Sequence, residues 1–316
     1  MTNIPYWYRP HRSHTKLPVL FIHGIGIGLH PYVSFLRELA AQDPDVGIVA
    51  VEILPISMRI TAPPLGRDAM CDAIMRILNA HGLHRVVVAG HSYGTVIAAH
   101  LLRKQQVASA NGTVSRDTEQ PQEEENDLDS SSNVGPSTIA AVLLIDPIPF
   151  LLHHPSVAYN FVYRHPRHAN EWQLWYFASR DADVARALSR HFFWFESVLF
   201  REDVLGAGRA GETKPHFAVS LAGRDQIVDT HTVWTYLTDG AAEQQPVDPD
   251  ACVQPSRWSG DGLEVLLFPK LDHATVFDAR ADRAPLLEVL SRFVRQEWAS
   301  GTSDDETDRA EGRGGN

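Results

Sequence analysis

Residues 85–95 read Arg-Val-Val-Val-Ala-Gly-His-Ser-Tyr-Gly-Thr, and this stretch decides the fold. The apolar run at 85–89 predicts a buried strand, and a helical pattern follows at 93–106. Between them lies Gly-x-Ser-x-Gly, which is typical of a sharp strand-to-helix turn that lifts the serine hydroxyl above a sheet. Glycine suits positions 90 and 94 because a Cβ there would clash with the neighbouring backbone. Ser92 is therefore a candidate nucleophile.

Short apolar runs alternate with amphipathic segments along the rest of the chain. We expect strands at residues 18–22, 46–51, 85–89, 139–145, 217–221 and 263–268. Helices are expected at residues 32–41, 67–81, 93–106, 230–237 and 285–298. This alternation is typical of a mainly parallel sheet with crossover helices, and strands that are apolar throughout are covered on both faces. The predicted fold class is α/β.

A serine hydroxyl needs a base to take its proton and a carboxylate to orient that base. Residues 222–228 (AGRDQIV) place Asp225 after one strand, and residues 269–275 (PKLDHAT) place His273 after the last strand. The chain order serine, acid, histidine differs from that of chymotrypsin and of subtilisin. We therefore expect His273 to act as the general base and Asp225 to orient it.

Three other residues near these loops have competing interpretations. Asp146 follows the strand at 139–145 and is the alternative acid, although Asp225 is favoured because an acid after the following strand is the commoner placement. Asp272 is expected to form a turn, and His91 to shape the turn at Ser92 rather than act as a second base.

An oxyanion hole should come from backbone amides, one of them directly after the nucleophile, at Tyr93. The glycine-rich stretch at residues 21–28 (FIHGIGIG) supplies the second donor, for which we favour the amide of Ile25 over that of Gly24. This stretch lacks the glycine spacing of a dinucleotide-binding loop.

The net charge of −11 is concentrated in two polar segments. Residues 107–137 carry −6 and residues from 299 onward carry −3, so the remaining body is close to neutral, which argues against binding of nucleic acids. The acidic insert at about 107–137 and the tail at about 300–316 are expected to be disordered. Residues 240–260 are expected to form a loop insertion.

Residues 150–200 contain 13 of the 28 aromatic side chains, at helical spacing. We expect a helical cap at about 150–209 over the sheet, with an ordinary aromatic core as the alternative. A cap that folds over Ser92 would form an apolar pocket for a hydrophobic acyl group, whereas outward aromatics would contact a membrane surface. The sequence does not separate these two interpretations.

The motifs around Gly24, Ser92, Asp225 and His273 together resemble the α/β-hydrolase superfamily over residues 17–298. Residues 19–26 (VLFIHGIG) and 144–147 (LIDP) resemble in particular fungal members that are known mainly by their fold. The resemblance implies one α/β-hydrolase domain over residues 1–316 and a Ser-His-Asp triad, but no substrate. Two features depart from it: the acidic insert, and the absence of strands before residue 17. The latter suggests that the gene model is truncated.

The remaining residues give no sign of a metal or cofactor. The histidine pairs at 11/14, 153/154 and 165/168 lack a Cys or acidic partner in a ligand pattern, so no metal or cofactor is expected. Two cysteines cannot form a disulfide framework, and no signal peptide or membrane-spanning stretch is visible. We expect an intracellular protein, with membrane association and oligomeric state left open.

These observations favour a carboxylic ester hydrolase, acting on a lipid ester, a thioester or another small ester through an acyl-enzyme. An acyltransferase or lyase that uses the same triad is one alternative, because the fold hosts many reactions. A non-catalytic binding or scaffold protein is another.

Overall fold

The apolar runs form the centre of a sheet in the computed structural model, which describes residues 4–114, 137–206, 214–240 and 255–297. The central strands are β2 (Val19–Ile22), β3 (Ile48–Val51), β4 (Arg85–His91), β5 (Thr138–Ile145), β6 (His216–Ala222) and β8 (Leu263–Phe268). Nearly all their residues are buried because helices cover both faces of the sheet. The six predicted strands and the α/β fold class are confirmed.

Two short strands complete the eight-stranded sheet, in the order β1-β3-β2-β4-β5-β6-β8-β7. The six central strands are parallel, whereas β1 (Tyr6–Arg9) and β7 (Ser256–Gly260) pair antiparallel with β3 and β8 at the two edges. The carboxyl ends of the parallel strands therefore meet along one edge, where the loops after β4, β6 and β8 converge.

Both edge strands contradict the sequence predictions. The expectation that no strand precedes residue 17 was wrong, because β1 does, and the loop expected at 240–260 ends in β7. Each edge strand is exposed or half-buried along its length, so neither carries the apolar run that marks a central strand. Residues 241–254 lie outside the described residues.

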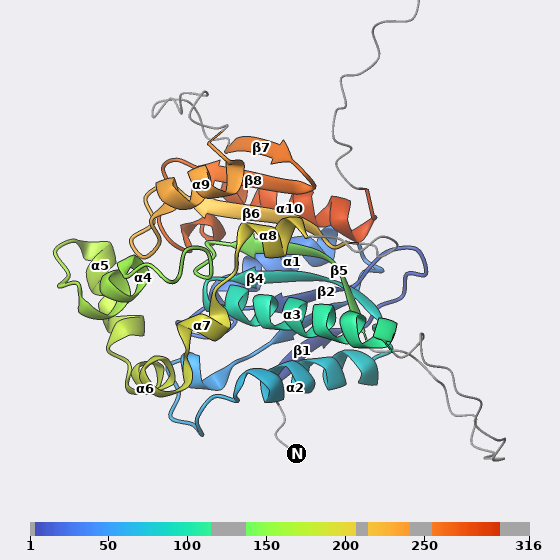
Figure 1. The fold of residues 1–316 in the computed structure, drawn as a ribbon, viewed down its shortest axis with the longest axis horizontal. Helices are drawn as coiled ribbons and strands as arrows, with labels where there is room; N and C mark the ends of the chain where they lie inside the picture. The colour runs from blue at the N-terminus through green and yellow to red at the C-terminus, as the bar shows by residue number, and fades with distance from the viewer. Residues whose placement is uncertain (1–3, 115–136, 207–213, 241–254, 298–316) are drawn as a thin grey trace, which may run out of the picture.

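Helices cover the two faces of the sheet (Figure 1). One face packs against α1 (Val33–Gln42) and α10 (Arg280–Val294), and the other against α2 (Arg67–Ala80), α3 (Tyr93–Val114) and α9 (Thr230–Thr238). Short 3-10 turns, η1 (His30–Tyr32), η2 (Leu54–Ile56) and η6 (Thr275–Phe277), lie in the connecting loops.

Two helices differ from their predicted bounds by more than one residue. Helix α3 continues to Val114 instead of ending at 106, so it takes in the first residues of the expected insert; residues 115–136 lie outside the described part. Helix α10 begins at Arg280, ahead of Pro285. Its first turn is anchored by Arg283, whose guanidinium donates to the carbonyl of Phe277 (2.6 Å) and to Glu38 (3.0 Å).

A run of short helices separates β5 from β6, and we call residues 156–205 the helical segment. It comprises α4 (Ser156–Ala158), η3 (Tyr159–Tyr163), α5 (Ala169–Leu174), η4 (Trp175–Ser179), α6 (Ala182–His191), α7 (Trp194–Ser197) and α8 (Arg201–Leu205). In Figure 1 α4, α5 and α6 lie together at one end of the molecule. The expected end of the cap near 209 and the tail from 300 lie outside the described residues.

Among the described residues, no helix combines the length and apolarity needed to cross a membrane. Cys71 is a free, buried residue of α2, and burial raises the pKa of its thiol to about 11. Cys252 is not among the described residues.

Candidate active site

Ser92 occupies the sharp turn between β4 and α3. Its φ of 50° lies in the left-handed region, which a non-glycine residue adopts only when its surroundings hold it there. The turn is held by a hydrogen bond from the Ser92 amide to the Ile145 carbonyl (2.9 Å). A Cβ on Gly90 would lie 2.8 Å from the Gly94 carbonyl oxygen, and one on Gly94 would overlap the Ile22 carbonyl. Gly90 therefore lets the end of β4 lie close to the start of α3, and Gly94 lets the turn pack against β2.

The loops after β4, β6 and β8 bring Ser92, Asp225 and His273 together. His273 Nδ1 lies 2.6 Å from Asp225 Oδ2, and its Nε2 lies 2.9 Å from Ser92 Oγ. Because an ionised carboxylate only accepts hydrogen bonds, Nδ1–H donates to Asp225, and in the neutral imidazole Nε2 accepts from the serine hydroxyl. The arrangement leaves the imidazole oriented to take the serine proton.

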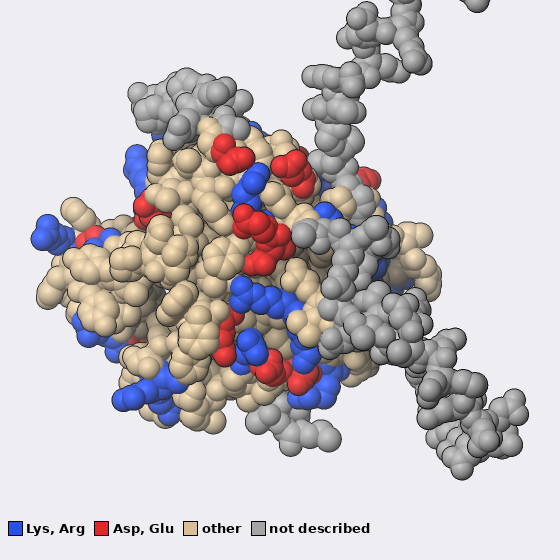
Figure 2. All heavy atoms as spheres, viewed as in Figure 1, with Lys and Arg blue, Asp and Glu red and all other residues tan. Residues whose placement is uncertain are grey.

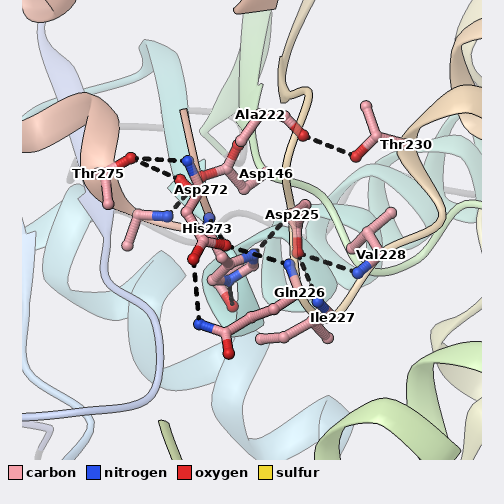
Figure 3. Close-up of polar contacts among 12 residues, drawn as sticks. Asp146, Ala222, Asp225, Gln226, Ile227, Val228, Thr230, Asp272, His273 and Thr275 are labelled. Atoms are coloured by element: carbon pink, nitrogen blue, oxygen red, sulfur yellow. Dashed lines mark hydrogen bonds and ion pairs between the residues drawn. The ribbon is translucent and has the colours of Figure 1, made fainter. Parts of the chain in front are cut away.

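Asp225 is itself fixed by its own loop (Figure 3). Its Oδ1 accepts from the amides of Ile227 (2.7 Å) and Val228 (3.0 Å), so that Oδ2 is directed at the imidazole. Asp272 connects this loop to the histidine loop, because its Oδ1 accepts from the amides of Gln226 (3.1 Å) and His273 (2.7 Å). Asp272 thus forms the turn expected of it and also joins the two loops.

The electrostatics of the site favour a charged imidazole. Burial lowers the pKa of His273, but the negative charge of Asp225 and the hydrogen bond to it outweigh burial and raise the pKa to about 9. Asp146 adds to this effect from its place at the end of β5. The raised pKa favours the imidazolium that forms when His273 takes the serine proton.

Asp146, the alternative acid, is buried next to the triad without contacting either imidazole nitrogen of His273. Its Oδ2 accepts from the amide of Ala274 (2.8 Å) and lies 3.6 Å from His91 Nε2. Burial alone would raise the pKa of Asp146, but His91 and the charge of His273 lower it. Asp146 therefore holds the loop that carries the catalytic candidate His273, whereas Asp225 contacts its ring.

A buried chain of polar contacts leads from Asp146 to the glycine-rich loop after β2. His91 Nδ1 lies 2.7 Å from Tyr32 Oη, and the Gly24 amide donates to the same oxygen (3.1 Å). Burial lowers the pKa of His91, so this ring is neutral. With Nε2–H facing Asp146, Nδ1 accepts from the tyrosine hydroxyl. The chain of contacts thus links the glycine-rich loop to the loop of His273.

The expected oxyanion donors lie at the same edge. His23 accepts from the Ile53 amide at Nε2 (2.8 Å), so its Nδ1–H donates to the Gly24 carbonyl (2.6 Å). Burial lowers the pKa of His23 to about 4, which keeps the ring neutral. In a trans peptide the N–H points away from the carbonyl, so the Ile25 N–H faces away from His23. Within the described residues, neither the Ile25 amide nor the Tyr93 amide donates to a protein acceptor.

Sequence reasoning missed the role of Tyr32 and used His23 only as part of the glycine-rich stretch at residues 21–28. Both act through contacts with residues far along the chain, which no local pattern indicates. The amide of Gly24, the second choice for the oxyanion hole, is already bonded to Tyr32.

Ser92 opens into an apolar cavity of about 340 Å³. One wall comes from Ile25, Ile148 and Ile227 near the strand ends, and the other from the helical segment and the residues just before it. The latter wall contains Leu152, His153, His154, Pro155, Val157, Ala158, Phe161, Val162, Leu188, Phe192 and Trp194. Only 7% of Ser92 is exposed, so a substrate would reach it through this cavity.

One group of possible metal ligands occurs among the described residues, and it is part of the same site. Asp146, Asp225 and His273 have ligand atoms within 4.8 Å of one another. His273 Nδ1 and Asp225 Oδ2 are already bonded to each other, so a metal would have to displace that hydrogen bond. The donor set therefore fits a hydrogen-bonded triad better than a metal site.

Comparison with known proteins agrees with this architecture. A family model described as "alpha/beta hydrolase fold" matches residues 18–211. Among solved structures, a carboxylesterase from Nitrososphaera gargenis is 12% identical with a TM-score of 0.52, over 93% of this chain and 96% of that chain. No curated protein matches the sequence.

Two further structures have a similar degree of likeness. A bacterial membrane phospholipase A is 13% identical with a TM-score of 0.52, over 94% of this chain and 85% of that chain. A serine hydrolase from Cycloclasticus zankles is 14% identical with a TM-score of 0.51, over 92% and 94% of the two chains. At these identities the likeness concerns the fold alone.

Proposed function

The chain belongs to the alpha/beta hydrolase family, and we propose that it is a serine hydrolase that cleaves carboxylic esters with hydrophobic acyl groups. The observation that carries the proposal is the hydrogen-bonded series from Ser92 Oγ through His273 to Asp225, with distances of 2.9 and 2.6 Å. The apolar cavity in front of Ser92 supports the choice of acyl group.

The proposed reaction is acyl transfer in two steps. His273 Nε2 takes the Ser92 proton as Oγ attacks the ester carbonyl, and the amides of Ile25 and Tyr93 hold the resulting oxyanion. His273 then donates this proton to the leaving alcohol, which leaves an acyl-enzyme on Ser92. In the second step His273 activates a water molecule, which releases the acid and restores the serine.

A fluorophosphonate probe tests the nucleophile directly. We expect wild-type protein to be labelled, Ser92→Ala to be unlabelled, and a matched change at an unrelated buried hydroxyl, Thr238→Ala, to be labelled as wild type. Thr238 lies at the end of α9, and among the described residues its hydroxyl bonds to its own helix, at the Trp234 carbonyl. Absence of labelling in folded wild-type protein would instead favour a non-catalytic binding protein.

A chain-length series of p-nitrophenyl esters tests the acyl preference. Each methylene buried in the cavity is worth about 0.8 kcal/mol, so kcat/KM should rise roughly fourfold per carbon until the cavity is full. A flat series would contradict the hydrophobic acyl site. Product analysis with added alcohols distinguishes hydrolysis from acyl transfer to an acceptor.

A further inference from the structure

The helical segment exposes an unusual amount of apolar surface. More than half of the exposed large apolar side chains of the described residues lie on it or directly next to it. We call these the aromatic collar: Tyr159, Val162, Tyr163, Trp172, Tyr176, Phe177, Phe193, Trp194, Phe195 and Phe200. Tyr163 and Tyr176 are 73% and 66% exposed. Soluble monomers rarely leave a large continuous apolar surface in water, so a binding partner is expected here.

The aromatic collar reaches the mouth of the cavity that contains Ser92. Val162 and Trp194 are exposed members of the collar, and both also line that cavity. The cavity joins two parts of the collar, because Val162 and Trp194 come from separate stretches of the chain. Around Trp194, the ring of Phe195 lies 5.9 Å from that of Phe193 and 6.2 Å from that of Trp194. Whatever covers the collar therefore lies next to the opening through which a substrate enters.

The charges around the collar point to an anionic partner. The carboxylates at 171, 181, 183 and 196 are each engaged by an amide or an arginine. By contrast, Arg167 and Arg190 have no ion pair within the described residues, and Arg180 lies over the ring of Trp175 (3.7 Å). Figure 2 shows the end that carries α4–α6 as mainly uncharged, with basic side chains at its margin. Residues 156–200 thus carry a net charge of +1, from five arginines against Glu171, Asp181, Asp183 and Glu196, although the chain as a whole is acidic.

We propose that the aromatic collar binds an anionic phospholipid surface, and that the cavity takes up the acyl chain of an ester lipid from that surface. Uptake of the acyl chain for cleavage rests on the proposed ester hydrolase function. Tryptophan and tyrosine rings favour the boundary between headgroups and acyl chains, where the ring is apolar and its polar edge remains hydrated. Arginine side chains at the margin pair with phosphates of the headgroups.

Vesicle cosedimentation of the full chain tests the collar. Vesicles of phosphatidylcholine mixed with phosphatidylglycerol should bind the wild type, and the triple variant Tyr163→Ser/Tyr176→Ser/Phe195→Ser should bind about tenfold or more weakly because apolar contact is lost. None of these three residues lines the cavity. The matched control is Trp7→Ser on edge strand β1, which is 71% exposed and distant in the fold, and should bind as wild type.

The double variant Arg167→Gln/Arg190→Gln tests the charge without altering the aromatic surface. Its binding to the mixed vesicles should fall roughly fivefold per arginine removed, while binding to phosphatidylcholine alone stays as weak as that of the wild type. This variant keeps the proposal testable if the triple variant does not fold.

Turnover of a soluble short-chain ester is measured in parallel. The collar variants should retain it, and Ser92→Ala should lose it while still binding vesicles. If vesicles bind but no ester is cleaved, the hydrolase proposal fails and the surface proposal stands. If the ester is cleaved but the wild-type protein binds neither type of vesicle, the surface proposal is overturned. A wild-type dimer that the triple variant abolishes, without vesicle binding, would overturn it in favour of self-association.

Discussion

Tyr32→Phe tests whether the buried contacts behind Ser92 position the catalytic groups. The change removes one oxygen that accepts from the Gly24 amide (3.1 Å) and contacts His91 Nδ1 (2.7 Å), and it creates no cavity of note. Two buried polar groups lose their partner, at about 1–3 kcal/mol each, so we expect the free energy of unfolding to fall by about 2–4 kcal/mol after local relaxation.

The same change should also slow the reaction. Tyr32 Oη holds the Gly24 amide, which belongs to the peptide directly before the one that carries the Ile25 N–H, so its loss should displace that donor. Deleting an oxyanion donor outright costs about 10²–10³-fold in kcat. A displaced donor should cost less, so we expect a loss of about 10- to 100-fold in kcat with KM little changed. Ester kinetics and thermal unfolding measure the two effects on the same preparation.

Tyr236→Phe is the matched control for this experiment. It removes a tyrosine hydroxyl that likewise accepts from a backbone amide, that of Arg201 (2.8 Å), but on α9 and away from Ser92. This variant should lose about 1 kcal/mol of stability and no kcat. A Tyr32→Phe enzyme with wild-type kcat would refute the positioning role, whatever its stability.

Three further predictions concern the triad and its turn. Asp225→Asn should lower kcat about 10⁴-fold through loss of the correct tautomer, while Asp146→Asn, which still accepts from the Ala274 amide, should cost little; the reverse ranking would reassign the acid. Because His273 must be neutral to act as a base and its pKa is raised to about 9, kcat/KM should rise about tenfold per pH unit below that value and level off above it; a midpoint at or below 6.5 in the pH profile would contradict this. Gly94→Ala should lose both stability and activity because its Cβ would overlap the Ile22 carbonyl, so unchanged thermal unfolding would argue against the packing described for the turn.

The parts of the fold that the sequence predicts are those with a strong local signal. Runs such as Val86–Ala89 are apolar throughout because they are covered on both faces, and they mark the central strands. The edge strands β1 and β7 carry no such signal, since their pairing is set by the long-range register with β3 and β8. Pro285 indicated a helix start, but the contacts of Arg283 begin the helix one turn earlier.

The candidate site likewise contains some residues with a local sequence signal and others that depend on long-range contacts. Ser92, Asp225 and His273 each follow a recognisable strand, and parallel strands bring their carboxyl ends to one edge, so their proximity could be predicted. The choice between Asp225 and Asp146 depends on which carboxylate reaches His273 Nδ1, which only distances decide. The roles of Tyr32 and His23 arise from packing between distant segments and had no local sign.

The placement of the helical segment has a consequence for how specificity could change. Strands β5 and β6 pair from Ala141 with His216 to Ile145 with Ser220, so the sheet closes without any contribution from the residues between them. The groups proposed to break the ester come from loops at the carboxyl ends of the strands, whereas most of the wall facing the acyl chain comes from one continuous stretch. Grafting a different stretch between these strands should therefore change substrate selectivity while the reacting groups keep their geometry. Substrate range and reaction chemistry could then evolve through changes in separate parts of the gene.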